Sequence, residues 1–594
     1  GQDLDELVER ADAEIARLKA EGPTAAEVAK AQNGYESGLV VGLQSAGRKA
    51  DFLNQYNVYY GDPLAYKKEM ARLLAVTPDD VKRVANKYLV AARIRLDVVP
   101  GPPTPRAPEA EVDRSAQGEI TSPTPPQVTD TFDRGVMPTP GPTPEFTPPP
   151  VVRRKLANGL EVLIIERHTL PILTLSLVVK GGENLTPEGK EGLAGLTADL
   201  MTEGTERRDA LALAGELSEI GASLNANSGL ESSSLALTTL TKHRGKALDL
   251  FADVLLHPSF PEKELERLRR QKLAALLRRA DNPSAIAGVV FPRLLYGAQH
   301  PYGRIDTARS VQGLARGDVV DFYKRLFVPN NAALVVVGDT TPEAITADLE
   351  RALADWKPGE APEAKRPEPP AARPVTVYLV DKPAAAQSVL AVGHVGVARR
   401  SPDYFPLVVM NAILGGQFSS RLNLNLREAK GYTYGARSAF AFRQGPGPFE
   451  AVAAVQTAVT KEALVELVKE LTDITEARPA TPTELAFAKD RLVKGFPSRF
   501  ETTFEVAGTL ADLVLYDLPA DYFATYQAKI EAVTGDDVGR VARKYLDPDH
   551  LVILVIGDRA QVEPALRTLE YAKVINALDP EGNPLPAAAD TETK

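Results

Sequence analysis

The segment VTGDDVGRVARKYLDPDHLVILVIGD (residues 533–558) has two earlier versions in this chain and decides its fold class. They are VTPDDVKRVANKYLVAARIRLDVVP (residues 76–100) and LARGDVVDFYKRLFVPNNAALVVVGD (residues 314–339). Each version has an Asp suited to a helix N-terminus, then apolar residues at helical spacing, and finally a turn and an apolar strand-like run. Three copies of one helix-turn-strand unit predict three related domains of mixed α and β structure.

Proline-rich stretches separate these domains. Fourteen of the 47 prolines lie between residues 101 and 150, and a shorter proline-rich stretch covers residues 357–374. Such segments bury little and favour extended conformations, so both are expected to be linkers. The two complete domains are expected to be α+β, with helices packed on antiparallel-rich sheets. The expected order is a partial domain, a linker, a full domain, a second linker, a second full domain and a flexible tail, at residues 1–100, 101–150, 151–356, 357–374, 375–572 and 573–594 respectively.

The first of these bodies matches only the later part of the last one. FLNQYNVYYGDPLAYKKEM (residues 52–70) is similar to LADLVLYDLPADYFATYQAKI (residues 510–530), but nothing in residues 1–100 matches the earlier half of that domain. The sequence is therefore expected to begin within a domain, with further polypeptide before it. The alternative is that residues 1–100 form a self-sufficient helical domain.

Composition excludes several classes of protein. The formal net charge of −10 leaves no basic excess to neutralise phosphates, so a nucleic-acid partner is not expected. No apolar run reaches the roughly 18 residues of a membrane-spanning helix. The chain has no cysteine, which rules out disulfide frameworks, thiolate metal sites and cysteine nucleophiles.

A helix with a recognisable environment is expected within NLTPEGKEGLAGLTADLMTEGT (residues 184–205). It places Leu193, Leu196 and Leu200 on one apolar face. Together with the preceding LTLSLVVKGGE, this segment resembles the helix of pitrilysin/insulinase-type peptidases that carries the inverted zinc motif HxxEH. Where that family has approximately GLAHFLEHMLFKGT, this chain has GLAGLTADLMTEGT.

The resemblance assigns the family's metal chemistry to four positions of this chain. The two histidine ligands correspond to Gly195 and Asp199, the catalytic Glu to Ala198, and the third ligand, also a Glu, to Ala275. A catalytic zinc needs three protein donors and an open position for water, and only Asp199 offers a donor here. The six histidines are scattered, with no pair at helical spacing. No cofactor is therefore expected in this chain, and zinc is expected in a partner half.

A second signature lies in LGGQFSSRLNLNLREAKGYTYGARS (residues 414–438), which resembles the family's GGGxSSRLxxxLRExxGxxY segment. The resemblance implies that Arg427 donates to a substrate carbonyl and that the hydroxyl of Tyr434 stabilises the oxyanion. The alternative is that Arg427 forms an ordinary surface ion pair with Glu428 and that Tyr434 has a packing role. Gly415 and Gly416 are expected to permit a tight turn.

A third segment, GASLNANSGLESSSLAL (residues 221–237), resembles the strand with which active relatives pair the substrate. Asn225 and Ala226 occupy the expected places in it. Because the neighbouring zinc positions are replaced, this strand is expected to be kept for the fold rather than for substrate binding.

Peptidases of this family consist of two halves that enclose a chamber, one with HxxEH and the other with the Arg/Tyr pair. The resemblance implies that residues 151–572 are the Arg/Tyr half of a zinc metallopeptidase, inactive alone. Its partner would be an HxxEH-bearing half, in the same gene product or a separate subunit, its substrates peptides, and its location the bacterial periplasm or outside the cell. Two alternatives are a catalytically dead scaffold subunit of the same fold and a stand-alone peptide-binding protein.

Overall fold

The computed structural model describes residues 4–99, 101, 133, 136, 145–364 and 367–586. The chain divides into two compact units. One comprises Gly1–Val28 with Arg72–Phe146, and the other comprises Ala29–Ala71 with Thr147–Lys594. The body expected at residues 1–100 is therefore divided between the two units. Most of the linker expected at residues 101–150, and the tail after residue 586, lie outside the described residues.

The first unit is helical. It contains α1 (Leu4–Glu21) and α5 (Pro78–Tyr88), which pack together. It also includes the N-terminal end of α2 (Ala25–Gly42) and the C-terminal end of α4 (Ala65–Leu74). A capping box starts α5, because Thr77 and Asp80 each accept a hydrogen bond from the other's backbone N–H. The helix expected in the first copy of the repeat is confirmed.

The prediction of a strand after α5 is wrong. Residues 89–99 form no regular strand, and Ile94, Leu96 and Val98 are 97%, 84% and 84% exposed. A strand is stable only when neighbouring strands take up its backbone hydrogen bonds. No strand pairs with this segment in the part of the chain that the structure describes.

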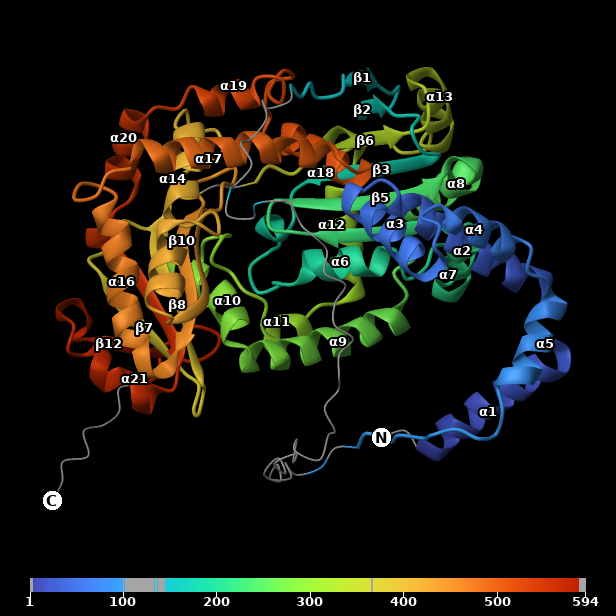
Figure 1. The fold of residues 1–594 in the computed structure, drawn as a ribbon, viewed down its shortest axis with the longest axis horizontal. Coiled ribbons are helices and arrows are strands. Elements are labelled where there is room, and N and C mark those ends of the chain that lie inside the picture. The colour runs from blue at the N-terminus through green and yellow to red at the C-terminus, as the bar shows by residue number, and fades with distance from the viewer. Residues whose placement is uncertain are drawn as a thin grey trace. The chain divides into compact units, whose positions relative to one another are not determined.

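The second unit contains two six-stranded sheets of the same design (Figure 1). The first has the order β1-β2-β6-β3-β5-β4 and the second the order β12-β7-β11-β8-β10-β9. In each, the strand of the repeat lies between one parallel and one antiparallel neighbour. The strands are β1 Val152–Lys155, β2 Glu161–Glu166, β3 Ile172–Lys180, β4 Ser223–Ser228, β5 Ser232–Leu240, β6 Ala332–Gly338, β7 Thr376–Asp381, β8 Gln387–Val395, β9 Thr433–Phe440, β10 Pro448–Gln456, β11 Val552–Gly557 and β12 Ile575–Leu578.

Most neighbouring strands are antiparallel, and helices cover the sheets, so the expected α+β class is confirmed. The helices of this unit, besides most of α2 and α4, are α3 Ala46–Tyr60, α6 Leu193–Met201, α7 Ala210–Glu219, α8 Arg244–Leu256, α9 Glu262–Asp281, α10 Pro283–Tyr296, α11 Ala308–Gln312, α12 Arg316–Leu326, α13 Pro342–Ala352, α14 Tyr404–Leu414, α15 Arg421–Asn423, α16 Thr460–Asp473, α17 Pro482–Gly495, α18 Thr503–Leu515, α19 Tyr526–Glu531, α20 Gly535–Tyr545 and α21 Arg559–Leu566. No helix among the described residues combines the length and apolarity needed to cross a membrane.

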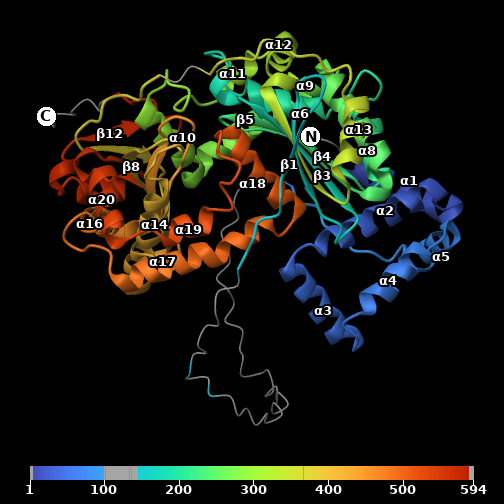
Figure 2. The same ribbon diagram turned by 90° about the horizontal axis from the view of Figure 1, so that it is seen from above.

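The two domains exchange a helix. Although α10 follows the strands of the first sheet in sequence, its Ile286, Val290 and Phe291 share a core with Val389 and Leu554 of the second sheet. In return α18 packs on β3 and β6 of the first sheet (Figures 1 and 2). The opposite face of the first sheet is covered by α6 and α8. Neither domain therefore has a complete core without the other.

The last domain extends further than expected. Residues 575–578 were expected to belong to a flexible tail, but they form β12, which runs parallel to β7. Leu578 is 3% exposed and pairs with Val380. The short apolar sequence INAL is enough for an edge strand once β7 is in place to receive it.

Candidate functional site

Arg427 and Tyr434 lie on consecutive elements of the second domain. After α15 the chain forms a π-helical turn (Leu424–Ala429), in which Lys430 N donates to Asn425 O at 3.0 Å. Such turns are rare and are found preferentially at functional sites. Arg427 lies in this turn, and Tyr434 is the second residue of β9, at the edge of the sheet.

Tyr434 faces solvent, whereas Arg427 is half-buried. Tyr434 is 89% exposed. The guanidinium of Arg427 lies over the ring of Phe418, with Cζ 4.4 Å from the ring centre. The ion pair weighed from the sequence is present, with 3.5 Å between Nε and Oε1 of Glu428, but both groups reach solvent and the pair contributes about 0–1 kcal/mol. Only Nε takes part in it, and the other guanidinium donors remain available for a ligand.

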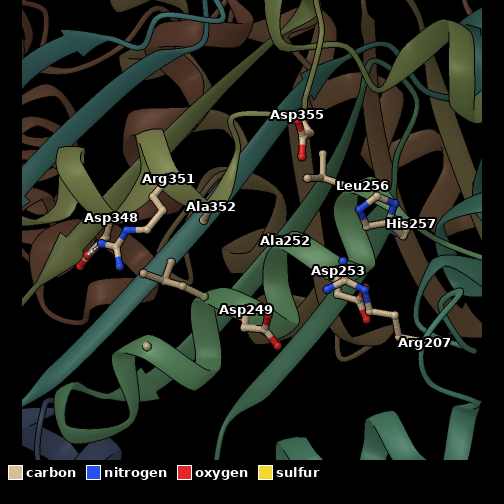
Figure 3. A pocket seen from close by; sticks show the side chains of 12 residues that line it. Arg207, Asp249, Ala252, Asp253, Leu256, His257, Asp348, Arg351, Ala352 and Asp355 are labelled. Carbon is tan, nitrogen blue, oxygen red and sulfur yellow. Dashed lines mark hydrogen bonds and ion pairs between the residues drawn. The ribbon is translucent and has the colours of Figure 1, made fainter.

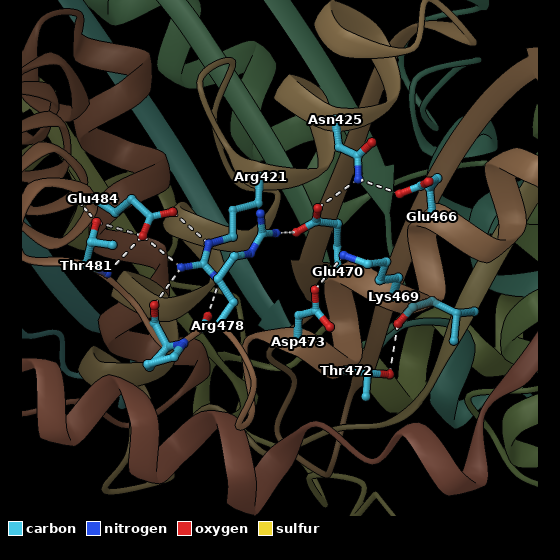
Figure 4. Close-up of polar contacts among 12 residues, drawn as sticks. Arg421, Asn425, Glu466, Lys469, Glu470, Thr472, Asp473, Arg478, Thr481 and Glu484 are labelled. Atoms are coloured by element: carbon cyan, nitrogen blue, oxygen red, sulfur yellow. Dashed lines mark hydrogen bonds and ion pairs between the residues drawn. The ribbon is translucent and has the colours of Figure 1, made fainter.

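A network of ion pairs and hydrogen bonds around the buried Arg421 anchors the turn (Figure 4). Arg421 is 5% exposed and makes two hydrogen bonds of 2.7 Å to the carboxylate of Glu484. One turn later, Asn425 donates to Glu466 at 3.0 Å and to Glu470 at 2.8 Å. These contacts fix the backbone at Arg427. The position of its guanidinium is therefore restricted even where the group reaches solvent.

The Arg421–Glu484 pair is expected to stabilise the fold in a pH-dependent way. Burial acts to raise the pKa of Glu484, but hydrogen bonds from Arg421 and Thr481 outweigh it and lower that pKa to about 2. Because the folded-state pKa is depressed, the stabilisation is present above pH 4.5 and is lost as the pH falls toward 2. We expect Glu484→Gln to lower the free energy of unfolding by about 1.5–3 kcal/mol at pH 7.

Urea titrations of both proteins at several pH values would measure this difference. The difference should shrink steadily between pH 4.5 and 2 as the wild-type carboxylate is protonated. A difference independent of pH would show that the ionised pair does not stabilise the turn.

Hydrogen bonds also join the turn to β9. Asn423 accepts from Ala436 N at 3.2 Å, and Tyr432 N donates to Leu426 O at 2.9 Å. Gly415, at the end of α14, lies so close to β9 that a Cβ there would be 2.4 Å from Ser438 N. A glycine is therefore needed at this position because two backbone segments approach each other closely.

Gly415→Ala is therefore expected to destabilise the protein by about 1–3 kcal/mol, because the added methyl group cannot be accommodated without moving β9. Chemical denaturation measures the loss. Gly508→Ala in α18 is the matched control, since a Cβ there has nothing within 4 Å and alanine favours a helix by about 1 kcal/mol. Equal stability of Gly415→Ala and wild type would contradict the close packing of α14 on β9.

Glu450 on β10 is a residue that the sequence reasoning missed. Burial raises its pKa to about 7, against the opposing effect of Arg437 on the neighbouring strand β9. Its signal in the sequence is a lone carboxylate within the apolar run PFEAVAAV. It places a titratable group on the sheet whose edge strand carries Tyr434.

The four positions assigned to metal chemistry lie on two packed helices, α6 and α9. The structure brings Asp199 and Ala275 together in a pocket of about 640 Å³, which Lys272 also lines. Gly195 lies beside them, because a Cβ at this position would be 3.5 Å from Lys272 Nζ. Ala198 is buried in the helix packing at 1% exposure. The apolar face expected for α6 is confirmed, since Leu193, Leu196 and Leu200 are all buried.

A lysine ammonium lies among carboxylates at this place. Lys272 Nζ is 3.3 Å from Asp306, whose pKa is lowered by Lys272 and Arg279 although burial acts to raise it. Burial raises the pKa of Glu183, and Lys272 opposes this together with hydrogen bonds from two backbone N–H groups. Burial also raises the pKa of Asp199, and Lys272 again opposes it. Lys272 was missed in the sequence, although it lies one helical turn before Ala275.

These residues do not fit a catalytic zinc. Of the four mapped positions only Asp199 can donate to a metal, and a cationic side chain lies beside it. No group of three or more His, Cys, Asp or Glu that could hold a metal ion was found among the described residues. In this pocket the charge of Lys272 compensates that of the neighbouring carboxylates.

Asn225 and Ala226 lie on β4, at the edge of the first sheet opposite to β1. They pair with Ala236 and Leu235 of β5, and β4 contacts α6. The strand that the sequence singles out is thus an edge strand next to the helix that carries Gly195 and Asp199.

A further polar pocket, of about 360 Å³, lies at α8 and α13 and contains none of the residues considered above (Figure 3). Asp253 is buried there and accepts hydrogen bonds from Thr205 at 2.7 Å and from Arg208 at 2.6 Å. Ion pairs from Arg208 to Asp249 and Asp253 hold α8 to the loop before α7.

Known proteins share this architecture. The model described as Insulinase (Peptidase family M16) matches residues 161–295, and the model described as Peptidase M16 inactive domain matches residues 313–492. The non-peptidase homolog YmxG of Helicobacter pylori is 25% identical over 408 residues, which are 67% of this chain and 92% of that protein. The probable mitochondrial-processing peptidase subunit beta of Arabidopsis thaliana is 22% identical over 416 residues, 68% of this chain and 77% of that protein.

Among solved structures, a peptidase M16 inactive domain from Pseudomonas fluorescens superposes with a TM-score of 0.64 at 27% identity, covering 68% of this chain and 97% of that one. Together the two matched models take in more than half of the sequence, with the inactive-domain model covering the Arg/Tyr segment. The chain therefore belongs to the insulinase, or M16, family of peptidases, as an inactive-type half of that fold.

Proposed function

We propose that this chain is the non-catalytic half of a zinc metallopeptidase, and that it supplies Arg427 and Tyr434 to a partner half that carries HxxEH. One observation carries the proposal: Tyr434, which is exposed, and Arg427, which is partly exposed, stand on a firmly anchored scaffold, and the described residues contain no ligand set for zinc. Zinc is proposed for the partner half alone.

The chemistry of the two side chains suits a peptide in the course of hydrolysis. A guanidinium presents several N–H donors in a fixed plane and can hold a peptide carbonyl. A phenol hydroxyl held beside the reacting carbon can donate to the oxyanion, and a donor placed in advance costs no reorganisation in the transition state. A chamber closed between two halves admits unfolded or short peptides, which are the proposed substrates.

The relatives support a partnership without identifying the partner. The Helicobacter pylori relative is named a non-peptidase homolog, and the Arabidopsis relative is named a subunit. The proposed setting, the bacterial periplasm or outside the cell, rests on the family resemblance and on the absence of cysteine from the sequence.

The test is reconstitution. The purified chain is mixed with a zinc-loaded M16 protein that has an intact HxxEH helix, from the same genome, and hydrolysis of a quenched fluorescent peptide is followed. Turnover should require both proteins. A partner that is fully active alone, and unchanged by the added chain, would refute the proposal.

A scaffold role is the second candidate, and the name of the non-peptidase homolog favours it. On this interpretation the chain binds its partner, but no property of the complex depends on Tyr434. Substitution of Tyr434 therefore separates the two candidates.

A further inference from the structure

Helices α3 and α18 are counterparts in the internal repeat. The sequences that contain them are similar, and a hydroxyl residue caps each N-terminus, Ser45 for α3 and Thr502 for α18. Each is followed by a short helix and then by the repeated helix that opens with a Thr/Asp capping box. What surrounds α18 therefore indicates what α3 is built to contact.

The N-termini of the two helices meet and exchange hydrogen bonds. Glu501, just before α18, accepts from Ala46 N in α3 at 2.6 Å. Gln44, just before α3, accepts from Thr503 N in α18 at 2.7 Å. Reciprocal contacts between equivalent segments are the mark of a two-fold related interface. An interface between the two copies of the repeat is thus already present in this unit.

The surroundings of the two helices differ sharply. Helix α18 lies on β3 and β6, and its Leu510 and Leu513 are 0% and 4% exposed. On α3, by contrast, Val58, Tyr59 and Tyr60 are 66%, 77% and 60% exposed. Figure 2 shows α18 beside the first sheet and α3 apart from it, and no strand among the described residues makes extensive contact with α3. A contiguous group of exposed aromatic and aliphatic side chains is typical of an interaction surface.

We propose that the α3 surface, formed by Leu53, Val58, Tyr59 and Tyr60, docks on the sheet of the HxxEH-bearing half as α18 docks on the first sheet. This inference rests on the proposed function and describes the surface through which the chain binds its partner. Two observations indicate that the protein that binds the α3 surface is a half of the same fold. The internal counterpart of α3 is covered by an M16-type sheet, and the α3–α18 contact continues directly into the exposed surface.

The segment after α5 points to the same occupant. It follows α5 as β11 follows α20, and β11 lies between β7 and β8. Its apolar residues Ile94, Leu96 and Val98 alternate with charged ones, so that one face could join a core. A half of the same fold would contain strands of the kind that flank β11, with which this segment could pair.

The experiment compares binding of the zinc-loaded HxxEH-bearing M16 protein from the same genome to the full chain and to the double variant Val58→Asp, Tyr59→Asp. Both residues are largely exposed, so the variant should fold with an unchanged far-UV circular dichroism spectrum and melting temperature. We expect its affinity for the partner to fall by at least tenfold. The matched control is Val574→Asp, which changes a residue that is 73% exposed in the last domain, and it should bind as wild type does.

Wild-type affinity of the double variant would overturn the inference. So would self-association of the wild-type chain that the double substitution abolishes, because the occupant would then be a second copy. The inference and the proposed function fail separately. Binding that depends on α3 without any effect of Tyr434→Phe on turnover refutes only the function, whereas turnover that depends on Tyr434 with α3-independent binding refutes only the docking surface.

Discussion

Replacing Tyr434 by Phe is expected to lower peptide turnover of the reconstituted enzyme by about 10² to 10³-fold, with little change in KM. The substitution removes one hydroxyl from a side chain that is 89% exposed, so no core packing is disturbed. Loss of a single oxyanion donor typically costs this much in kcat, because the bond forms fully only in the transition state. Steady-state kinetics with a quenched fluorescent peptide provides the measurement.

Tyr88→Phe serves as the control, since it removes a hydroxyl from another exposed tyrosine, 63% exposed, in a different unit of the chain. It should leave kcat and KM unchanged. Partner affinity of Tyr434→Phe should equal that of wild type, which excludes an effect through assembly. An unchanged kcat in Tyr434→Phe would remove this residue from the mechanism and favour the scaffold role.

A zinc site is expected to return only when Lys272 is removed. Replacing Gly195 and Asp199 by His and Ala275 by Glu restores the three donors that a zinc ion needs. A Cβ at position 195 fits, since its nearest contacts would be 3.5 Å or more away. The ammonium of Lys272 lies 3.5 Å from that Cβ, however, and even two unit charges about 4 Å apart repel by about 4 kcal/mol near a protein surface, while zinc carries a double charge.

Zinc affinity, measured by competition with a chelating dye, should therefore be on the order of 10²–10³-fold higher when Lys272→Met is added to the triple variant. Lys272→Met alone should bind no zinc at this place, because it adds no donor. Equal affinity with and without Lys272 would show that the ammonium does not occupy the space of the metal.

The local elements of the fold could be predicted from the sequence because they depend on neighbours in the chain. The second and third copies of the repeat form β6 and β11 as expected, and the apolar face of α6 is buried. The first copy has the same pattern, but residues 89–99 form no strand. Alternating apolar residues allow a segment to pair as a strand, but the strand forms only when a neighbouring strand provides hydrogen-bond partners for its backbone.

Packing between distant segments could not be predicted in this way. Nothing in the periodicity of α10 or α18 indicates that each lies on the other domain's sheet, because an apolar face does not name its partner. The role of Arg421 could not be predicted from the sequence either. In the sequence it is one more arginine, and only the fold brings it to Glu484, more than sixty residues away.

The candidate site was located partly by resemblance. The structure shows that Tyr434 is exposed while Arg427 is half-buried, and that Asp199 and Ala275 line one pocket. Lys272 could not be found from a pattern of metal donors, because a lysine that compensates the nearby carboxylates is not a metal ligand.

The most direct test of the central claim is the zinc content of the purified chain, determined by plasma mass spectrometry and paired with a peptidase assay of the same sample. The account predicts less than stoichiometric zinc and no unaided proteolysis, with activity appearing only when the HxxEH-bearing half is added. One zinc per chain, lost together with unaided activity on Asp199→Ala, would contradict it.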